Sequence, residues 1–171
     1  MSKTLIYIHD PMCSWCYGFG PALAALRAGL PSDLGYRRLL GGLAPDCAEA
    51  MPEAMRLQIQ ETWRRIEGRI PGIRFNHDFW TRCTPRRSTY PACRAVIAAR
   101  IQDPTLDEAM TAAIQRAYYQ EARNPSERET LIALAGEIGA DPVAFAAALD
   151  APATLVTLGQ ELALTQALRV S

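Results

Sequence analysis

Residues 4–16 read TLIYIHDPMCSWC, in which an apolar, strand-like run ends at Asp10-Pro11 and a Cys-X-X-Cys pair follows at once. The pair is Cys13 and Cys16, and a helix-compatible stretch begins directly after it. Thiols at a helix start lie near unpaired backbone N–H groups and the positive end of the helix dipole, which favour the thiolate. The stretch therefore predicts a strand-to-helix junction and redox chemistry at that junction.

A second strand is expected at residues 34–40, which end at a Gly-Gly pair. The helix between the strands, at about residues 15–27, has apolar residues at helical spacing and is expected to pack on the first strand, residues 4–9. Strand, helix and strand in this order form a βαβ unit, which implies parallel pairing and a right-handed crossover.

The rest of the chain is predicted to be helical. Helices are expected at residues 52–67, 91–101 and 152–168, and residues 73–85 are expected to form a loop. Three more helices are expected to begin at Asp103-Pro104, Asn124-Pro125 and Asp141-Pro142, because each dipeptide places a capping side chain before a first-turn proline. Two strands are too few for a stable sheet, so either helices cover them heavily or further strands follow residue 171.

Composition limits the classes of function. The chain has 171 residues, 49% of them hydrophobic, which suits a single globular domain. Its 18 basic and 18 acidic residues cancel, so neither nucleic acid nor an anionic membrane is an expected partner. It has no signal-peptide core and no apolar run of about 20 residues, which predicts a soluble, cytoplasmic protein. In a reducing cytosol, five cysteines indicate catalysis, metal binding or inert burial.

Disulfide exchange needs one thiolate that attacks, a second thiol that resolves the mixed disulfide, and a short spacing between them. We expect Cys13 to be the exposed nucleophile and Cys16 to be the buried resolving thiol. The intervening residues, Ser14 and Trp15, would tune the redox potential. A substrate surface for extended polypeptide could include Met12, Tyr17 and Phe19, although Tyr17 and Phe19 fit equally well as core residues of the helix.

The other candidate residues have simpler explanations. His9 could lower the pKa of Cys13 if it were protonated and close, but a side chain at a strand end can equally point away. The cluster of Arg86, Arg87 and Arg94 is expected to be a solvated face. The remaining cysteines could form a second disulfide or a metal site with His77, but their spacing matches no standard zinc pattern. They are expected to be buried small hydrophobes: Cys47, Cys83 and Cys93.

Four segments together resemble one known family, the DsbA-like branch of the thioredoxin superfamily, particularly its cytoplasmic predicted disulfide isomerases. They are DPMCSWCYGF (residues 10–19), GGL (41–43), YPACRA (90–95) and YQEARNP (119–125). The resemblance implies an α/β, thioredoxin-like fold with a large all-helical insertion. It also implies Cys13 as nucleophile and Cys16 as its partner.

Mapped on this family, residues 1–171 form one domain. Residues 1–44 are the βαβ half with the redox motif, 45–150 the helical insert, and 151–171 a helix that leads back. Family members continue past a motif like that at residues 168–171 into a cis-proline loop, a strand hairpin and a closing helix. On this mapping we expect residues 1–171 to lack the C-terminal strands, and we expect Pro91 to lie at a helix start rather than in the cis-proline loop. We therefore expect the natural chain to continue past Ser171.

The sequence thus predicts a thiol–disulfide oxidoreductase or isomerase that acts on protein or peptide thiols, with glutathione as a further partner and no prosthetic group. One alternative is a glutathione-dependent isomerase or transferase of the kappa type, which usually carries serine where Cys13 stands. Another is a non-catalytic module that binds a metal or a partner protein through Cys13 and Cys16.

Overall fold

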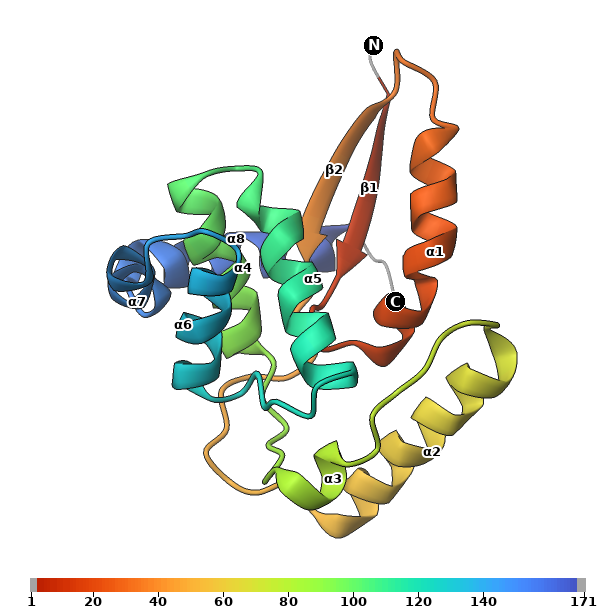
Figure 1. The fold of residues 1–171 in the computed structure, drawn as a ribbon. Helices are drawn as coiled ribbons and strands as arrows, with labels where there is room; N and C mark the ends of the chain where they lie inside the picture. Colours follow the sequence, from red (N-terminus) through yellow and green to blue (C-terminus); the bar gives the residue numbers. More distant parts are fainter. Residues whose placement is uncertain (1–2, 169–171) are drawn as a thin grey trace.

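The structure, a computed structural model, describes residues 3–168. Two strands, β1 (Thr4–His9) and β2 (Gly35–Leu40), pair in parallel, and α1 (Ser14–Ala28) connects them (Figure 1). The register places Thr4 opposite Gly35 and His9 opposite Leu40. The predicted βαβ unit is therefore confirmed. Residues 169–171, which carry most of the C-terminal motif noted above, lie outside the described residues.

Seven helices follow β2 within the described range: α2 (Glu53–Arg69), α3 (Phe79–Arg82), α4 (Tyr90–Gln102), α5 (Leu106–Tyr119), α6 (Arg128–Glu137), α7 (Pro142–Leu149) and α8 (Pro152–Ala167). All but α3 were expected. The prediction of a loop at residues 73–85 is wrong over this single turn, which is too short to show a helical period. Buried Phe79 and Trp80 hold it against Trp63 of α2.

The three capping side chains behave differently. Asp141 accepts hydrogen bonds from the first two free N–H groups of α7, at 2.8 and 2.9 Å, as expected. Asp103 and Asn124 instead accept from the backbone N–H two residues further on, at 2.8 and 3.1 Å. These bonds close local turns before the helices, so α5 and α6 begin only at Leu106 and Arg128.

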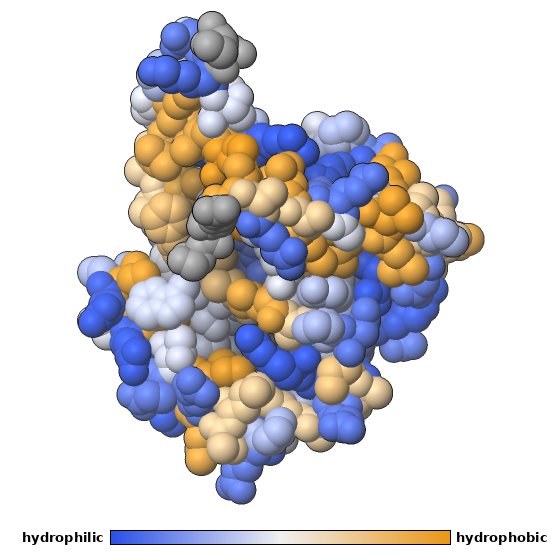
Figure 2. Space-filling model, turned by 180° about the vertical axis from the view of Figure 1, so that it is seen from behind, coloured by the Kyte–Doolittle hydropathy of each residue, from blue (hydrophilic) through white to orange (hydrophobic). Residues whose placement is uncertain are grey.

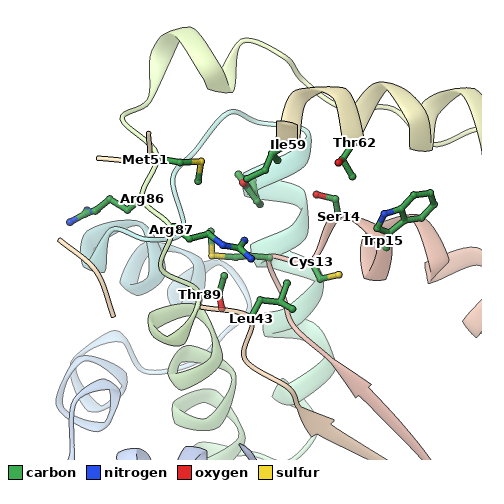
Figure 3. Close-up of a pocket in the computed structure, with 12 residues that line it drawn as sticks. Cys13, Ser14, Trp15, Leu43, Met51, Ile59, Thr62, Arg86, Arg87 and Thr89 are labelled. Carbon is green, nitrogen blue, oxygen red and sulfur yellow. The ribbon is translucent and has the colours of Figure 1, made fainter. Parts of the chain in front are cut away.

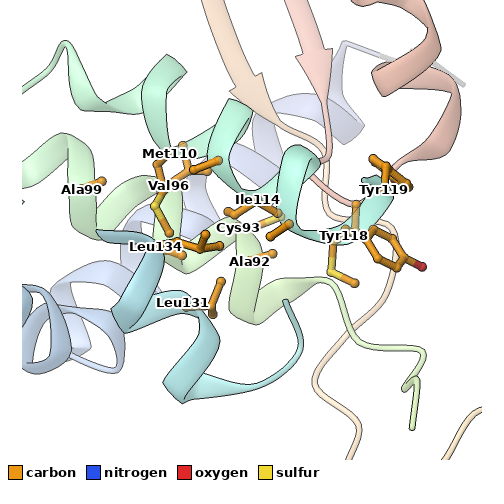
Figure 4. Close-up of a cluster of buried hydrophobic side chains, with 14 of the residues drawn as sticks. Ala92, Cys93, Val96, Ala99, Met110, Ile114, Tyr118, Tyr119, Leu131 and Leu134 are labelled. Carbon is orange, nitrogen blue, oxygen red and sulfur yellow. The ribbon is translucent and has the colours of Figure 1, made fainter. Parts of the chain in front are cut away.

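The main core surrounds α4, which packs against α5, α6, α7 and α8. Residues 92–99 of this helix are all buried, and its many alanines let the neighbouring helices approach closely (Figure 4). A second group of buried or half-buried aromatic rings joins α2 and α3 to the end of α5: Tyr17, Trp63, Phe75, Phe79, Trp80, Tyr118 and Tyr119. This aromatic group fixes the helical part of the chain next to α1.

Polar contacts join the sheet to the helices. Glu161 of α8 accepts a hydrogen bond of 2.7 Å from the Leu40 backbone N–H. It also forms an ion pair with Arg100 of α4, at 2.5 Å. Seen from behind, apolar residues form an interrupted band that runs from the α1 side of the molecule across α8 (Figure 2). Exposed Leu155 and Val156 of α8 are among the apolar surface residues.

Among the described helices, none is long and apolar enough by itself to cross a bilayer; α7 and α8 satisfy length and composition only when they are combined, and a 62° bend separates them. The elements β1, α1 and β2 fall within residues 1–44, α2 to α7 fall within 45–150, and α8 falls within 151–171. The division of the single domain at these boundaries stays a prediction.

Candidate active site

The cysteine pair lies where β1 passes into α1. Cys13 is the residue before the first turn of α1, and its sulfur accepts a hydrogen bond of 3.4 Å from the backbone N–H of Cys16. The backbone N–H of Cys13 donates to the carbonyl oxygen of Asp10 at 3.0 Å. The sulfur therefore lies at the positive end of the helix, which is the arrangement that stabilises a thiolate.

The expected contrast between an exposed Cys13 and a buried Cys16 is not found, because both thiols are half-buried. The two sulfurs instead share a proton through a hydrogen bond from the Cys13 thiol to Cys16. This bond lowers the pKa of Cys16 to about 6, against the opposing effect of burial, and together with burial it raises the pKa of Cys13. The first ionisation therefore belongs to the pair, and the shared proton decides which sulfur carries the charge.

The two thiols face different cavities. Cys13 lines a cavity of about 160 Å³ beneath α2, together with Ser14 and Trp15 (Figure 3). Cys16 lines another cavity, of about 260 Å³, whose walls include Tyr7 of β1. The Tyr7 side chain is hydrogen-bonded to Cys16, and burial is the main reason why the pKa of Tyr7 is raised. Access to the space beneath α2 therefore distinguishes Cys13 from Cys16.

Asp10 organises the loop before the cysteines. Only 2% exposed, its carboxylate accepts hydrogen bonds from the backbone N–H groups of Met12 and Leu43, at 2.7 and 2.8 Å, and from the Thr89 hydroxyl at 2.6 Å. The Cys93 thiol also lies 3.7 Å from it. Burial raises the pKa of Asp10, and these hydrogen bonds oppose the rise. Asp10 thus connects the redox loop to the loop after β2 and to α4.

His9 does not supply a positive charge to the thiols. Its ring is buried and stacks on Tyr7, with ring centres 5.3 Å apart, and its Nε2 accepts a 2.9 Å hydrogen bond from Arg38. Burial, together with the charges of Arg38 and Arg100, lowers the pKa of His9 to about 3. The ring is therefore neutral at pH 7, and the hypothesis of a protonated His9 beside Cys13 is wrong.

The residues around the thiols divide between core and surface. The Ser14 hydroxyl accepts a 2.9 Å hydrogen bond from the Trp63 indole. Met12 is buried, and the half-buried Tyr17 ring stacks on Tyr119 with centres 4.6 Å apart. Trp15 and Phe19 are each about two-fifths exposed. Of the predicted substrate surface, Met12 lines the cavity that contains Cys13, Tyr17 packs against other aromatic rings, and Phe19 is accessible. A role of these residues in binding substrate stays a prediction.

The remaining cysteines are free thiols, like the pair itself. Cys93 is fully buried, as expected, but Cys47 and Cys83 are half-buried, because each lies in a loop at the edge of the core. His77 hydrogen-bonds Glu67 at 3.2 Å. Among residues 3–168, no group of three or more His, Cys, Asp or Glu side chains is arranged to hold a metal ion.

The three arginines do not form a solvated face. Arg94 is 8% exposed and makes a two-pronged ion pair with Asp46, at 2.8 and 2.9 Å. Arg86 and Arg87 are half-buried and line the cavity that contains Cys13. The sequence does not predict that Arg86 and Arg87 lie beneath α2, because no local pattern in their segment indicates it.

The sequence matches the thioredoxin family model over residues 6–171. The chain belongs to the thioredoxin family. Solved structures of DsbA-like oxidoreductases share the fold of this thioredoxin-family chain. The fold is accordingly thioredoxin-like with a helical insertion, as predicted, and it supports thiol–disulfide oxidoreductase activity. No curated protein sequence matches the chain.

Three solved structures are similar to this chain in both sequence and fold. A candidate protein disulfide isomerase from Nitrosomonas europaea is 25% identical, with a TM-score of 0.86 over 100% of this chain and 81% of that one. The cytosolic disulfide reductase DsbM from Pseudomonas aeruginosa is 34% identical, with a TM-score of 0.78 over 96% and 77% of the two chains. DsbM with glutathione is 32% identical, with a TM-score of 0.76 over 97% and 81%.

Proposed function

We propose that this protein is a cytoplasmic disulfide reductase or isomerase that acts on protein or peptide substrates, with Cys13 as nucleophile and Cys16 as resolving thiol. The main support is the placement of Cys13 at the start of α1, facing a cavity that Cys16 does not line. Similarity to a cytosolic disulfide reductase at 34% identity favours reduction as the direction. The glutathione complex of that relative favours glutathione as a reducing partner.

The reaction proceeds through a mixed disulfide. The shared proton moves to Cys16, and the Cys13 thiolate attacks one sulfur of the substrate disulfide. A bond forms between Cys13 and that sulfur, and the second substrate sulfur leaves as a thiolate that takes up a proton. Cys16 then loses its proton and attacks the Cys13 sulfur, which releases the first substrate sulfur. The substrate gains two electrons, and the protein is left with a Cys13–Cys16 disulfide that a thiol donor reduces.

Two serine variants separate the two roles. Cys13→Ser is expected to stay folded and to lose insulin reduction and the rearrangement of scrambled disulfides. Cys16→Ser is expected to accumulate a mixed disulfide with substrate, because the resolving step is missing. Non-reducing electrophoresis and mass spectrometry detect this adduct. Retained reductase activity in Cys13→Ser would overturn the proposal, and an adduct on Cys16 in that variant would reverse the roles.

A further inference from the structure

The cavity at Cys13 continues beneath α2. A second cavity of about 170 Å³ shares Ile59, Thr62 and Arg87 with it and extends toward Met55 and Gln58. The two spaces therefore form one groove, with Cys13 at one end and Arg87 where they meet. Volumes of this size suit a small molecule or a short peptide segment.

The groove is positively charged. Its lining contains Arg86 and Arg87 and no carboxylate side chain. The N-terminus of α1 adds partial positive charge at the Cys13 end. An anionic group in this groove would therefore meet attractive charge and no acidic side chain.

Arg87 is available for a ligand. Arg38, Arg94 and Arg100 each form an ion pair with a carboxylate. By contrast, Arg87 is half-buried, and its side chain forms no ion pair or hydrogen bond with any residue from 3 to 168. In Figure 3 its guanidinium extends between Ile59 and Leu43 toward Cys13, whereas Arg86 points the other way. A half-buried guanidinium without a partner favours a ligand that supplies a carboxylate.

We propose that Arg87 binds the carboxylate of a small anionic thiol while the sulfur of that thiol reacts at Cys13. This inference rests on the proposed function and specifies its electron donor. The donor thiolate attacks Cys13 in the Cys13–Cys16 disulfide, and Cys16 leaves as a thiolate. A second donor thiolate then attacks the donor sulfur of the mixed disulfide and releases Cys13. Two donor thiols become one disulfide, and the protein regains its dithiol.

Three probe thiols test the charge preference. They are 3-mercaptopropionate (anionic), 2-mercaptoethanol (neutral) and cysteamine (cationic). Stopped-flow fluorescence of the tryptophans follows reduction of the oxidised protein, and each rate is corrected for the thiolate fraction of the probe. We expect the ratio of anionic to neutral rates to fall ~3- to 10-fold in Arg87→Gln, as for the loss of a partly buried charge-assisted contact.

Matched variants make the result specific. Arg82→Gln removes an exposed charge from the same segment outside the groove, and it is expected to keep the wild-type ratio. Arg87→Lys should keep part of the preference, and Arg87→Glu should reverse it in favour of cysteamine. In the wild type, added NaCl should lower the ratio of anionic to neutral rates toward that of Arg87→Gln. This salt test does not depend on the folding of any variant.

The two proposals fail in different ways. An unchanged ratio in folded Arg87→Gln, or a wild-type ratio insensitive to salt, would overturn the role of Arg87 while leaving disulfide reduction intact. Failure of all three thiols to reduce the wild-type disulfide, together with no activity on insulin, would instead contradict the proposed function.

Discussion

The indole Nε1 of Trp63 donates a hydrogen bond to the hydroxyl oxygen of Ser14, 2.9 Å away. Trp63 is fully buried in α2 among aromatic rings, and Ser14 lies between the two redox cysteines. The hydroxyl oxygen of Ser14 is therefore bonded to α2, and this contact holds the first turn of α1 in place.

We expect Trp63→Phe to lower the free energy of unfolding by about 2 kcal/mol, because it removes this hydrogen bond and part of a buried ring. A double-mutant cycle with Ser14→Ala, measured by denaturant unfolding, should give a coupling of about 0.5–1.5 kcal/mol. A coupling of zero within error would show that the contact does not join the insert to the redox motif.

The cysteine pair should react at mildly acidic pH. Alkylation by iodoacetamide, resolved by mass spectrometry, is expected to rise with an apparent pKa of about 6, because the two thiols share a proton. Cys13→Ala should raise the pKa of Cys16, since the hydrogen bond from Cys13 is the main cause of its lowering and burial opposes it. Reactivity that begins only near pH 9 in the wild type would contradict the shared proton.

Asp10→Ala should destabilise the fold by about 2–4 kcal/mol, because it leaves the N–H groups of Met12 and Leu43 without an acceptor and removes the 2.6 Å hydrogen bond from Thr89. The control is Asp33→Ala at an exposed position, with an expected change within about 0.5 kcal/mol. Equal stabilities of the two variants in denaturant unfolding would contradict this structural role.

The charge of Asp10 also gives a dependence on pH. Because burial raises its pKa, the folded protein binds this proton more tightly than the unfolded chain. The stability gained from this tighter proton binding is fully present below pH 3.8, the ordinary pKa of the group. It is lost as pH rises through the raised pKa of Asp10. The stability of the wild type relative to Asp10→Asn should therefore fall as pH rises, and a flat difference would contradict the raised pKa.

His9 should remain neutral between pH 5 and 8, because its pKa is lowered to about 3. Its ring signal in NMR is expected not to titrate in this range, and the signal should persist in His77→Gln, which removes the only other histidine. The unfolded chain binds this proton near pH 6.5, so the contribution of His9 to stability is lost as pH falls from 6.5 toward 3. His9→Gln should reduce that acid sensitivity; a titration near pH 6.5 in the folded protein would contradict the assignment.

Local patterns in the sequence predicted the βαβ unit, the helical character of the remaining chain and the position of the cysteine pair. The helical spacing of apolar residues, the capping residues and the strand-to-helix junction each depend on residues only a few positions apart. Local patterns do not fix helix boundaries: Asp103 and Asn124 have the same pattern as Asp141, but they close turns before the helices. The resemblance to a known family added the specific redox chemistry.

Tertiary structure decided the environment of the thiols. Arg87 and Arg94 are seven positions apart in one segment, yet one lines the groove at Cys13 and the other pairs with Asp46. Asp10 receives its hydrogen bonds from the redox loop, the loop after β2 and the start of α4. Such contacts join segments far apart in the chain, so they depend on how the helices dock against the sheet. Local sequence patterns therefore locate the redox pair, whereas its surroundings form only when distant segments pack together.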